Sequence, residues 1–170
     1  MTYKEYKELT NMDRLRYPEK SFFKLWLFNG CFRLIHRYRI VCFLRAKRCL
    51  FLAYCVERYL YNRLCGRLGC NIPSSVKIGG GFKIDHANGV IINSKAIIGN
   101  NCSVKSGVVI GSNDSGVPVI GNDVLIGVHA LLIGGIKIGN RAKIGAGAIV
   151  VHDVKDGATM ICEPAHVKGE

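Results

Sequence analysis

Long apolar runs are missing from this chain of 170 residues. Its longest uncharged apolar stretches, residues 25–32 and 49–56, have eight residues each, whereas a helix needs about 20 to cross a bilayer. The opening segment MTYKEYKEL also lacks the apolar centre of a signal peptide. The sequence therefore predicts no membrane-spanning segment, and we expect a cytoplasmic protein.

Patterns typical of metal sites are missing as well. The chain has eight cysteines and five histidines, but no two cysteines are separated by two residues and no histidine-rich segment occurs. We therefore expect no metal. The cysteines of the first 70 residues are expected to be small buried hydrophobes in a reducing compartment. Cys102 is expected to pack inside its repeat.

Acidic residues are scarce, 12 against 24 Lys and Arg, and the imbalance is local. Residues 1–71 carry 15 basic and 5 acidic side chains, whereas residues 72–170 carry 9 and 7. Fourteen of the 15 aromatic residues lie in the first part, and 17 of the 20 glycines lie in the second. We therefore divide the chain into a basic, aromatic-rich helical arm, residues 1–71, and a glycine-rich domain, residues 72–170.

Within the arm, apolar residues recur at helical spacing between residues 21 and 68, with arginines between them. Two helices with a break near Gly30 or around Lys47 fit this pattern. We expect them to cap the open end of the following domain. An alternative is that this face also lies on an anionic membrane surface. Nucleic-acid binding is not expected, because no recognised module accompanies the charge.

The second domain is organised by a six-residue repeat. An aliphatic residue, usually followed by Gly, recurs at this interval, with two extra residues after Ile84 and four after Ile110. The period fits neither a helix nor simple strand alternation. It is typical of a solenoid of short parallel strands, in which the repeated residues stack as a continuous core. These rungs are Ile72, Ile78, Ile84, Ile92, Ile98, Val104, Ile110, Ile120, Ile126, Leu132, Ile138, Ile144 and Val150.

Three segments give the domain a specific resemblance. IGGGFKIDHANG at 78–89, VVIGS at 108–112 and IGAGAIV at 144–150 look like the serine acetyltransferase branch of the hexapeptide acyltransferases. The resemblance covers residues 70–165. It implies a mainly β fold, a left-handed parallel β-helix, and a homotrimer. It also implies acetyl transfer from acetyl-CoA, as co-substrate, to a hydroxyl.

Such a transfer needs a base, and histidine suits this role near neutral pH. His86 and His129 both fall at corners of the repeat. Assigning the rungs in turn to three faces puts both on one edge, two coils or about 10 Å apart. The resemblance matches Asp85 and His86 to an acceptor-binding carboxylate and the general base. His129 is the runner-up, because VLIGVHALLIGG at 124–135 resembles the galactoside acetyltransferases at their catalytic histidine.

The same edge is predicted to hold the long pantetheine arm of acetyl-CoA against exposed backbone groups. The resemblance matches amides at Ser112, Val128 and Ala146 to the CoA contacts, and Lys143 to a basic position near the CoA end. The predicted cofactor-binding set is Gly111, Ser112, Val128, Lys143, Ala146 and Gly147.

Two departures from the family bear on the acceptor. Asn71 stands where the family has an Asp that orients the base, and an amide does not stabilise a charged imidazole as a carboxylate does. The family's ArgHisPro, which grips the amino-acid carboxylate, is missing from GSNDSGVP at 111–118. We therefore expect a sugar hydroxyl of a capsule, exopolysaccharide or lipopolysaccharide as acceptor. The alternatives are serine O-acetylation and a catalytically inactive scaffold trimer.

Overall fold

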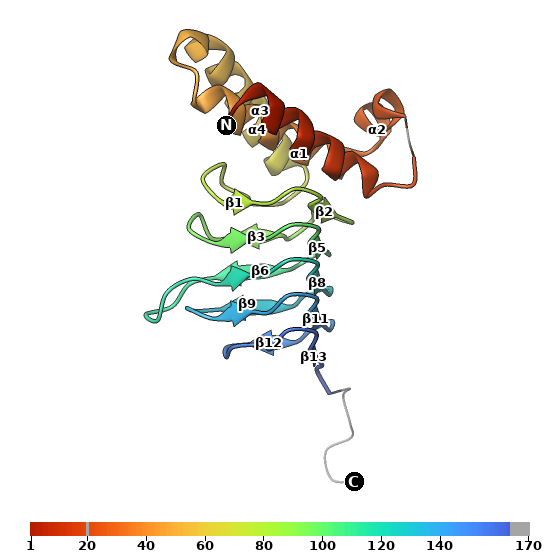
Figure 1. Cartoon of the computed structure of the whole chain (residues 1–170), viewed down its shortest axis with the longest axis vertical. Coiled ribbons are helices and arrows are strands. Elements are labelled where there is room, and N and C mark those ends of the chain that lie inside the picture. Colours follow the sequence, from red (N-terminus) through yellow and green to blue (C-terminus); the bar gives the residue numbers. More distant parts are fainter. Residues whose placement is uncertain (20, 164–170) are drawn as a thin grey trace.

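The computed structural model describes residues 1–19 and 21–163, and shows a helical arm lying across one end of a triangular solenoid (Figure 1). The arm contains α1 (Tyr3–Leu15), α2 (Phe22–Phe28), α3 (Gly30–Arg45), the short 3₁₀ helix η1 (Arg48–Leu50) and α4 (Phe51–Arg67). The helical structure is interrupted both before Gly30 and around Lys47, although an interruption was expected at only one of these two places. Helix α1 was not predicted at all. None of the described helices combines the length and apolar character that crossing a bilayer requires.

Side-chain caps explain where these helices begin. Thr2 and Glu5 form a reciprocal capping box at the start of α1, which is a sequence signal that identifies this helix. Asn29 Oδ1 accepts a hydrogen bond from the Phe32 amide at 2.8 Å and so starts α3 directly after α2. The predicted single break at Gly30 is therefore an Asn cap between two helices.

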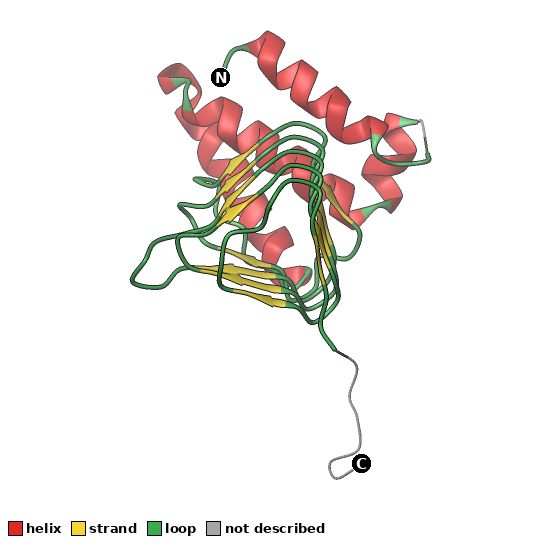
Figure 2. Cartoon of the chain, turned by 60° about the horizontal axis from the view of Figure 1, so that its bottom comes forward, coloured by secondary structure: helices red, strands yellow, loops and turns green. Residues whose placement is uncertain are grey.

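The solenoid is built from short parallel strands that form three sheets, one per face of the triangle (Figure 2). We name these faces B, C and A in the order in which the chain visits them. Face B contains β1 (Lys77–Ile78), β4 (Ile97–Ile98), β7 (Val119–Ile120) and β10 (Lys137–Ile138). Face C contains β2 (Lys83–Ile84), β5 (Ser103–Val104), β8 (Leu125–Ile126), β11 (Lys143–Ile144) and β13 (Thr159–Met160). Face A contains β3 (Ile91–Ile92), β6 (Val109–Gly111), β9 (Leu131–Ile133) and β12 (Ile149–Val150).

The thirteen predicted rungs are all buried, at 8% exposure or less, and together fill the solenoid. The small side chains four places after a rung, among them Cys102, are buried beside them. Successive strands lie on the three faces in turn, as in a parallel β-helix, and the helical arm precedes them. The predicted fold class, a β-helix with an N-terminal helical arm, is therefore confirmed. The expectation for the other cysteines is only partly met, because Cys49 and Cys55 are exposed.

A buried ion pair fixes the arm to the first coil. The Arg39 guanidinium binds both carboxylate oxygens of Asp13, at 2.8 and 3.1 Å, and donates to the carbonyl of Ile78. Asp13 also accepts from the amide of Phe82 at 2.9 Å. The sequence pattern placed Arg39 among the arginines between apolar positions, but it is 2% exposed. Because both charges are buried, removing one partner would leave the other uncompensated.

A column of amide side chains runs down the edge between faces B and C. Asn122 Oδ1 accepts from the Asn100 amide at 2.7 Å, and Asn140 Oδ1 accepts from the Asn122 amide at 2.9 Å. The column begins at the Gly80 amide, which donates to Asn100, and ends at Asp156, which accepts from Asn140. The repeated tripeptide IGN at 98–100, 120–122 and 138–140 is the sequence signal for it.

Candidate active site

The two extra residues after Ile84 are His86 and Ala87, and they form a bulge on the edge between faces C and A. Asp85 continues the ladder by donating its amide to the Val104 carbonyl at 3.1 Å, and the Asn88 carbonyl accepts from Gly107 at 2.8 Å. Asn88 and Gly89 therefore stack above Ser106 and Gly107. Ala87 is buried and His86 is exposed, so the imidazole lies on the outside of the corner.

The helical arm packs directly against this bulge. Gly89 donates its amide to the Gly69 carbonyl at 2.8 Å, and the Cys31 thiol donates to the Asp85 carbonyl at 3.6 Å. Gly69 has a φ of +62°, and a Cβ there would lie 3.0 Å from Asn88 Oδ1. Glycine at this position therefore lets the linker after α4 approach the bulge. The site is thus built jointly by the solenoid and the arm.

A cavity of about 430 Å³ lies where the two parts meet. Its walls include Cys31, Arg67, Leu68, His86, Ala87 and Asn88. Arg67 is the cationic side chain of this wall and comes from the last turn of α4. No sequence pattern points to Arg67, because only the packing of α4 brings it into the same cavity wall as His86, 19 positions away. The cavity is therefore lined by both an imidazole and a guanidinium.

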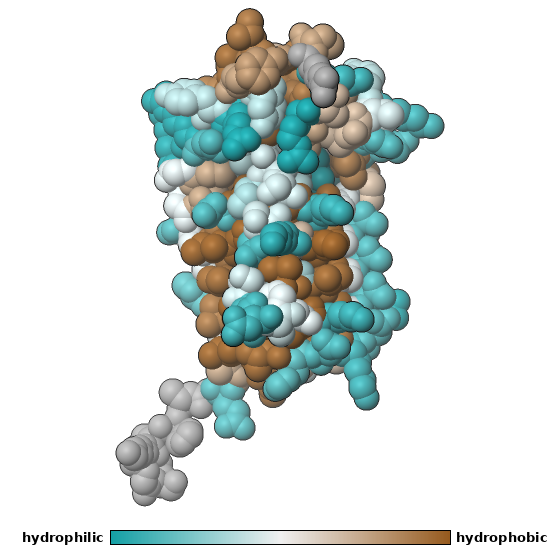
Figure 3. All heavy atoms as spheres, turned by 90° about the vertical axis from the view of Figure 1, so that its left-hand side faces the viewer, coloured by the Kyte–Doolittle hydropathy of each residue, from teal (hydrophilic) through white to brown (hydrophobic). Residues whose placement is uncertain are grey.

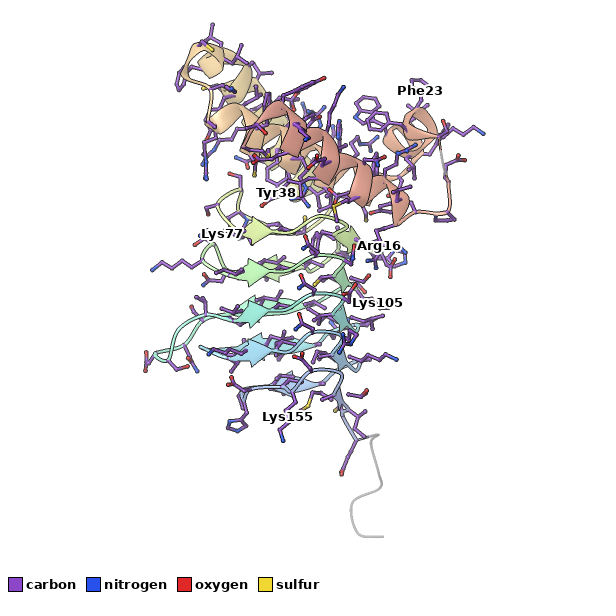
Figure 4. The ribbon with its side chains drawn as sticks, viewed as in Figure 1. Arg16, Phe23, Tyr38, Lys77, Lys105 and Lys155 are labelled. Atoms are coloured by element: carbon purple, nitrogen blue, oxygen red, sulfur yellow. The ribbon has the colours of Figure 1, made fainter. Side chains whose placement is uncertain are left out.

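Asp85 is held by two lysines on the outer surface of face C. Its carboxylate oxygens lie 2.7 Å from Lys83 Nζ and 3.2 Å from Lys105 Nζ, and Figure 4 labels Lys105 on the coil below. Burial opposes ionisation of this carboxyl, but the two ammonium groups outweigh it and lower the pKa of Asp85 below its ordinary value. Asp85 is therefore an anion whose charge the lysines more than balance.

Asn71 begins face A, where the structure gives it backbone partners. Its amide donates to the Val90 carbonyl at 2.8 Å, and it pairs with Ile91 in a bridge. Within residues 1–19 and 21–163, no hydrogen bond joins Asn71 to the His86 imidazole. The predicted role of Asn71 in orienting the base stays a prediction.

His129 lies on the same edge as His86, two coils further down. Its φ is +56°, and Gly89, Gly107 and Gly147 adopt the same left-handed conformation in the neighbouring coils. The ring packs on Gly107, where a Cβ would overlap it. The absence of a side chain at Gly107 thus makes room for the imidazole. His129 is exposed and directed along the edge that carries His86.

The predicted CoA contacts fall into two groups. Val128, Ala146 and Gly147 lie on the edge shared by His86 and His129. In the described part of the chain, the amides of Val128 and Ala146 donate to no protein acceptor, because the ladder uses the amides of Gly127 and Gly145. These two amides are free to bind an acyl carrier.

Three other predicted contacts lie elsewhere. Gly111 and Ser112 are at the far side of face A, where Ser112 accepts from Asn93 at 3.1 Å. They do not lie along the histidine edge, and the prediction of one continuous edge was wrong for them because the chain crosses a whole face between Val108 and Ser112. Lys143 points outward from β11 on face C. No group of three or more metal-ligating side chains occurs in residues 1–19 and 21–163.

Comparison with known proteins identifies the family. The family model "Bacterial transferase hexapeptide (six repeats)" matches residues 118–152. The serine acetyltransferase of Bacillus subtilis is 35% identical over 152 residues, which cover 87% of this chain and 68% of that protein. The chain belongs to the serine acetyltransferase family. It spans about half the length of other curated relatives, for example 48% of the serine acetyltransferase of Bacillus licheniformis, which is 42% identical over 103 residues.

Solved structures of the serine acetyltransferase family superpose over nearly the whole chain. The Neisseria gonorrhoeae serine acetyltransferase in complex with serine has a TM-score of 0.75 and 32% identity, and the match covers 96% of this chain and 68% of that one. A serine acetyltransferase in complex with CoA has a TM-score of 0.72 and 29% identity, covering 92% and 64%.

These relatives correct the predicted acceptor. The absence of an arginine from residues 111–118 led us to expect a sugar hydroxyl, but the matching relatives and structures are named serine acetyltransferases. The expectation of a capsule, exopolysaccharide or lipopolysaccharide acceptor was therefore wrong. It relied on two departures, Asn71 and the ArgHisPro missing from residues 111–118, and took no account of cations, such as Arg67, that the helical arm contributes.

Proposed function

We propose that this chain is an acetyl-CoA-dependent acetyltransferase that acetylates the hydroxyl of serine. The observation that carries the proposal is the cavity lined by both His86 and Arg67, on the same edge of the solenoid that carries, further down, the free amides of Val128 and Ala146. Membership of the serine acetyltransferase family supports the reaction, and relatives in complex with serine and with CoA support the two substrates.

The chemistry follows from the position of His86. As the serine hydroxyl oxygen attacks the thioester carbonyl carbon, the imidazole takes the hydroxyl proton. The carbon–sulfur bond breaks and the CoA sulfur leaves with that proton, which the imidazolium returns. The products are O-acetylserine and CoA. Val128 and Ala146 support this step by offering amides to the pantetheine arm along the same edge.

Arg67 suits the other end of the acceptor. Serine carries a carboxylate, and a guanidinium binds a carboxylate through two parallel hydrogen bonds. Asp85 does not compete for Arg67, because Lys83 and Lys105 already hold its carboxylate. In this proposal Arg67 replaces the arginine that residues 111–118 lack.

A homotrimer is part of the proposal. The outward side chains of face A are apolar in each of its four strands, where Ile91, Val109, Leu131 and Ile149 stack in register. Ile149 is 66% exposed. Faces B and C carry lysines in the corresponding column, so face A is the surface best suited to a second copy. This face adjoins the histidine edge.

The proposal is tested by measuring CoA release from acetyl-CoA with a thiol reagent. We expect turnover with serine and much less with ethanolamine, which has the same hydroxyl and amine but no carboxylate. His86→Ala should lower kcat by about 10²- to 10⁴-fold, the usual contribution of a general base. Arg67→Gln should raise KM for serine and leave ethanolamine turnover unchanged.

His129→Ala is the matched control, since it removes an imidazole from the same edge. A loss of turnover that followed His129 and spared His86 would reverse the assignment of the base. Absence of acetyl-CoA turnover with serine in the folded wild type would overturn the proposed function and favour the inactive scaffold.

A further inference from the structure

A second hollow, of about 270 Å³, lies on the helical arm and is lined mainly by arginines. α3 contributes Arg33 and Arg37, α4 contributes Arg63 and Arg67, and Trp26 of α2 forms part of the wall. No described residue of the proposed reaction other than Arg67 lies in it.

The positive charge of this arginine hollow is largely uncompensated. Arg37 pairs with Glu57, and Arg33 Nη1 donates to the carbonyls of Trp26 and Leu27, both at 3.1 Å. Arg63 and Arg67 have no protein partner within residues 1–19 and 21–163, but the proposed function assigns Arg67 to serine, so Arg63 is the unpartnered cation left for another anion. Four guanidinium groups therefore face one carboxylate, and two of the four are held in place by protein acceptors. This arrangement favours an anionic partner.

Exposed apolar side chains occur on α2 and α4, two of the helices that line the hollow. On α2, Phe23 and Leu27 are 69% and 43% exposed and lie one turn apart, next to Trp26. On α4, Leu52 and Val56 are 80% and 57% exposed, and their spacing places them on the helix face that continues to Leu60 and Arg63. Figure 3 shows hydrophobic side chains gathered at this end of the molecule, and Figure 4 shows Phe23 there, pointing away from the solenoid.

We propose that the helical arm docks on an anionic lipid bilayer, with lipid phosphates at the arginine hollow and the flanking apolar side chains among the acyl chains. A free phosphate would account for the arginines but would leave the aromatic and aliphatic rim in water. A bilayer surface satisfies both, because its headgroup layer is anionic and the layer beneath it is apolar. A second copy of the chain packed on this face would bring two sets of arginines together, which like charges oppose.

The single tryptophan of the chain reports on the site, because Trp26 lines the hollow. The full chain is titrated with phosphatidylcholine vesicles, with and without phosphatidylglycerol, and binding is followed by vesicle flotation and by Trp26 emission. We expect flotation and a blue shift with the anionic vesicles alone, and weaker binding as the salt concentration rises.

Matched pairs of variants separate docking from general charge. Arg63→Gln should weaken partitioning about fivefold, the effect expected for one cation near anionic headgroups, and Phe23→Ser should weaken it and reduce the blue shift. Lys155→Gln and Ile161→Ser remove an exposed cation and an exposed apolar side chain from the opposite end of the solenoid, where Figure 4 labels Lys155. Both should bind like the wild type.

Several results would overturn the proposal. One is an equal loss with Lys155→Gln, which would mean attraction by net charge alone. Another is full competition by soluble glycerol phosphate, which would indicate a small-molecule site. A third is binding to duplex DNA without binding to vesicles. The last is a larger assembly in sedimentation that Phe23→Ser dissolves, which would show that a second copy covers this face. None of these readouts depends on acetyl transfer.

Discussion

His36 shows how far the surroundings of one residue can depart from its sequence context. It lies among the arginines of the basic arm, but its ring is half-buried against Phe22, Phe32 and Tyr6. Its Nδ1 is buried without a hydrogen-bond partner in the described residues. Burial, and then the charge of Arg37, lower the pKa of His36 from 6.5 to about 4.

This shift predicts a loss of stability in acid. The unfolded chain binds a proton at His36 below pH 6.5, whereas the folded protein does so only below about 4. The unfolded state therefore holds more protons between these values, and the free energy of unfolding should fall as the pH falls from about 6.5 toward 4. His36→Phe should reduce this decline, as measured by urea unfolding at pH 7 and pH 5. An identical pH dependence in the variant would contradict the argument.

The candidate site also differs in part from what its sequence context indicates. The exposed corner position of His86 could be predicted, because it follows from counting residues between rungs. Arg67 and Cys31 could not be predicted, because they reach the cavity through helix packing that no repeat encodes. The lysines around Asp85 were also missed, although they occupy the outward position before a rung, or just after one, where side chains meet between coils.

At the scale of elements, the amide column on the edge between faces B and C should contribute measurably to stability. Asn122 accepts one backbone hydrogen bond and donates its side-chain amide to Asn140 at 3.3 Å. Asn122→Ala leaves the Asn100 amide without this acceptor and should lower the free energy of unfolding by about 1 kcal/mol. Chemical denaturation measures this directly.

Asn62→Ala is the control for that change. Asn62 is exposed on α4 and its side chain makes no hydrogen bond within the described residues, and alanine favours a helix. Its substitution should leave stability unchanged or slightly raised. Equal destabilisation by both changes would show that the column contributes nothing particular.

The elements differ in how well they could be predicted. Strands β1–β12 follow from the rungs, because each contains one, but β13 (Thr159–Met160) lies beyond the last predicted rung, Val150, and was not predicted. The helices follow only in part, because α1 depends on a cap at Thr2 and on a buried carboxylate that binds Arg39. A charged pair such as Asp13 and Arg39 is invisible to an apolar pattern, since it is defined by two residues 26 positions apart.

At the scale of the whole molecule, face A decides the proposed assembly. Ile149→Glu would place a carboxylate in the apolar column and should shift the protein from trimer to monomer in sedimentation equilibrium. Val119→Glu is the matched control, because Val119 is 42% exposed on face B. A wild type that sediments as a monomer, or dissociation by the face B variant alone, would contradict the trimer.

The backbone changes from helix to solenoid coil between Arg67 and Asn71. The last helix ends at Arg67, and Asn71 already pairs with Ile91 of the next coil. Composition could indicate this change because glycine-rich corners and aromatic helices use different residues. The way the arm lies across the coil could not be inferred, because it depends on Tyr38 and Tyr61 donating to the carbonyls of Val76 and Ile72.

The amide column also divides the molecule into a constant edge and two variable ones. The interval from the inward residue of a face B strand to that of the next face C strand is always six residues, from Ile78 to Ile84 and again in every later coil. From face C to face A the interval rises to eight residues once. From face A to face B it is ten residues after Ile110 and four before Val154, which pairs with Ile138. The edge at which asparagine side chains hydrogen-bond from coil to coil thus keeps the coils aligned. The other two edges accept insertions and deletions, and new binding loops evolve through such changes.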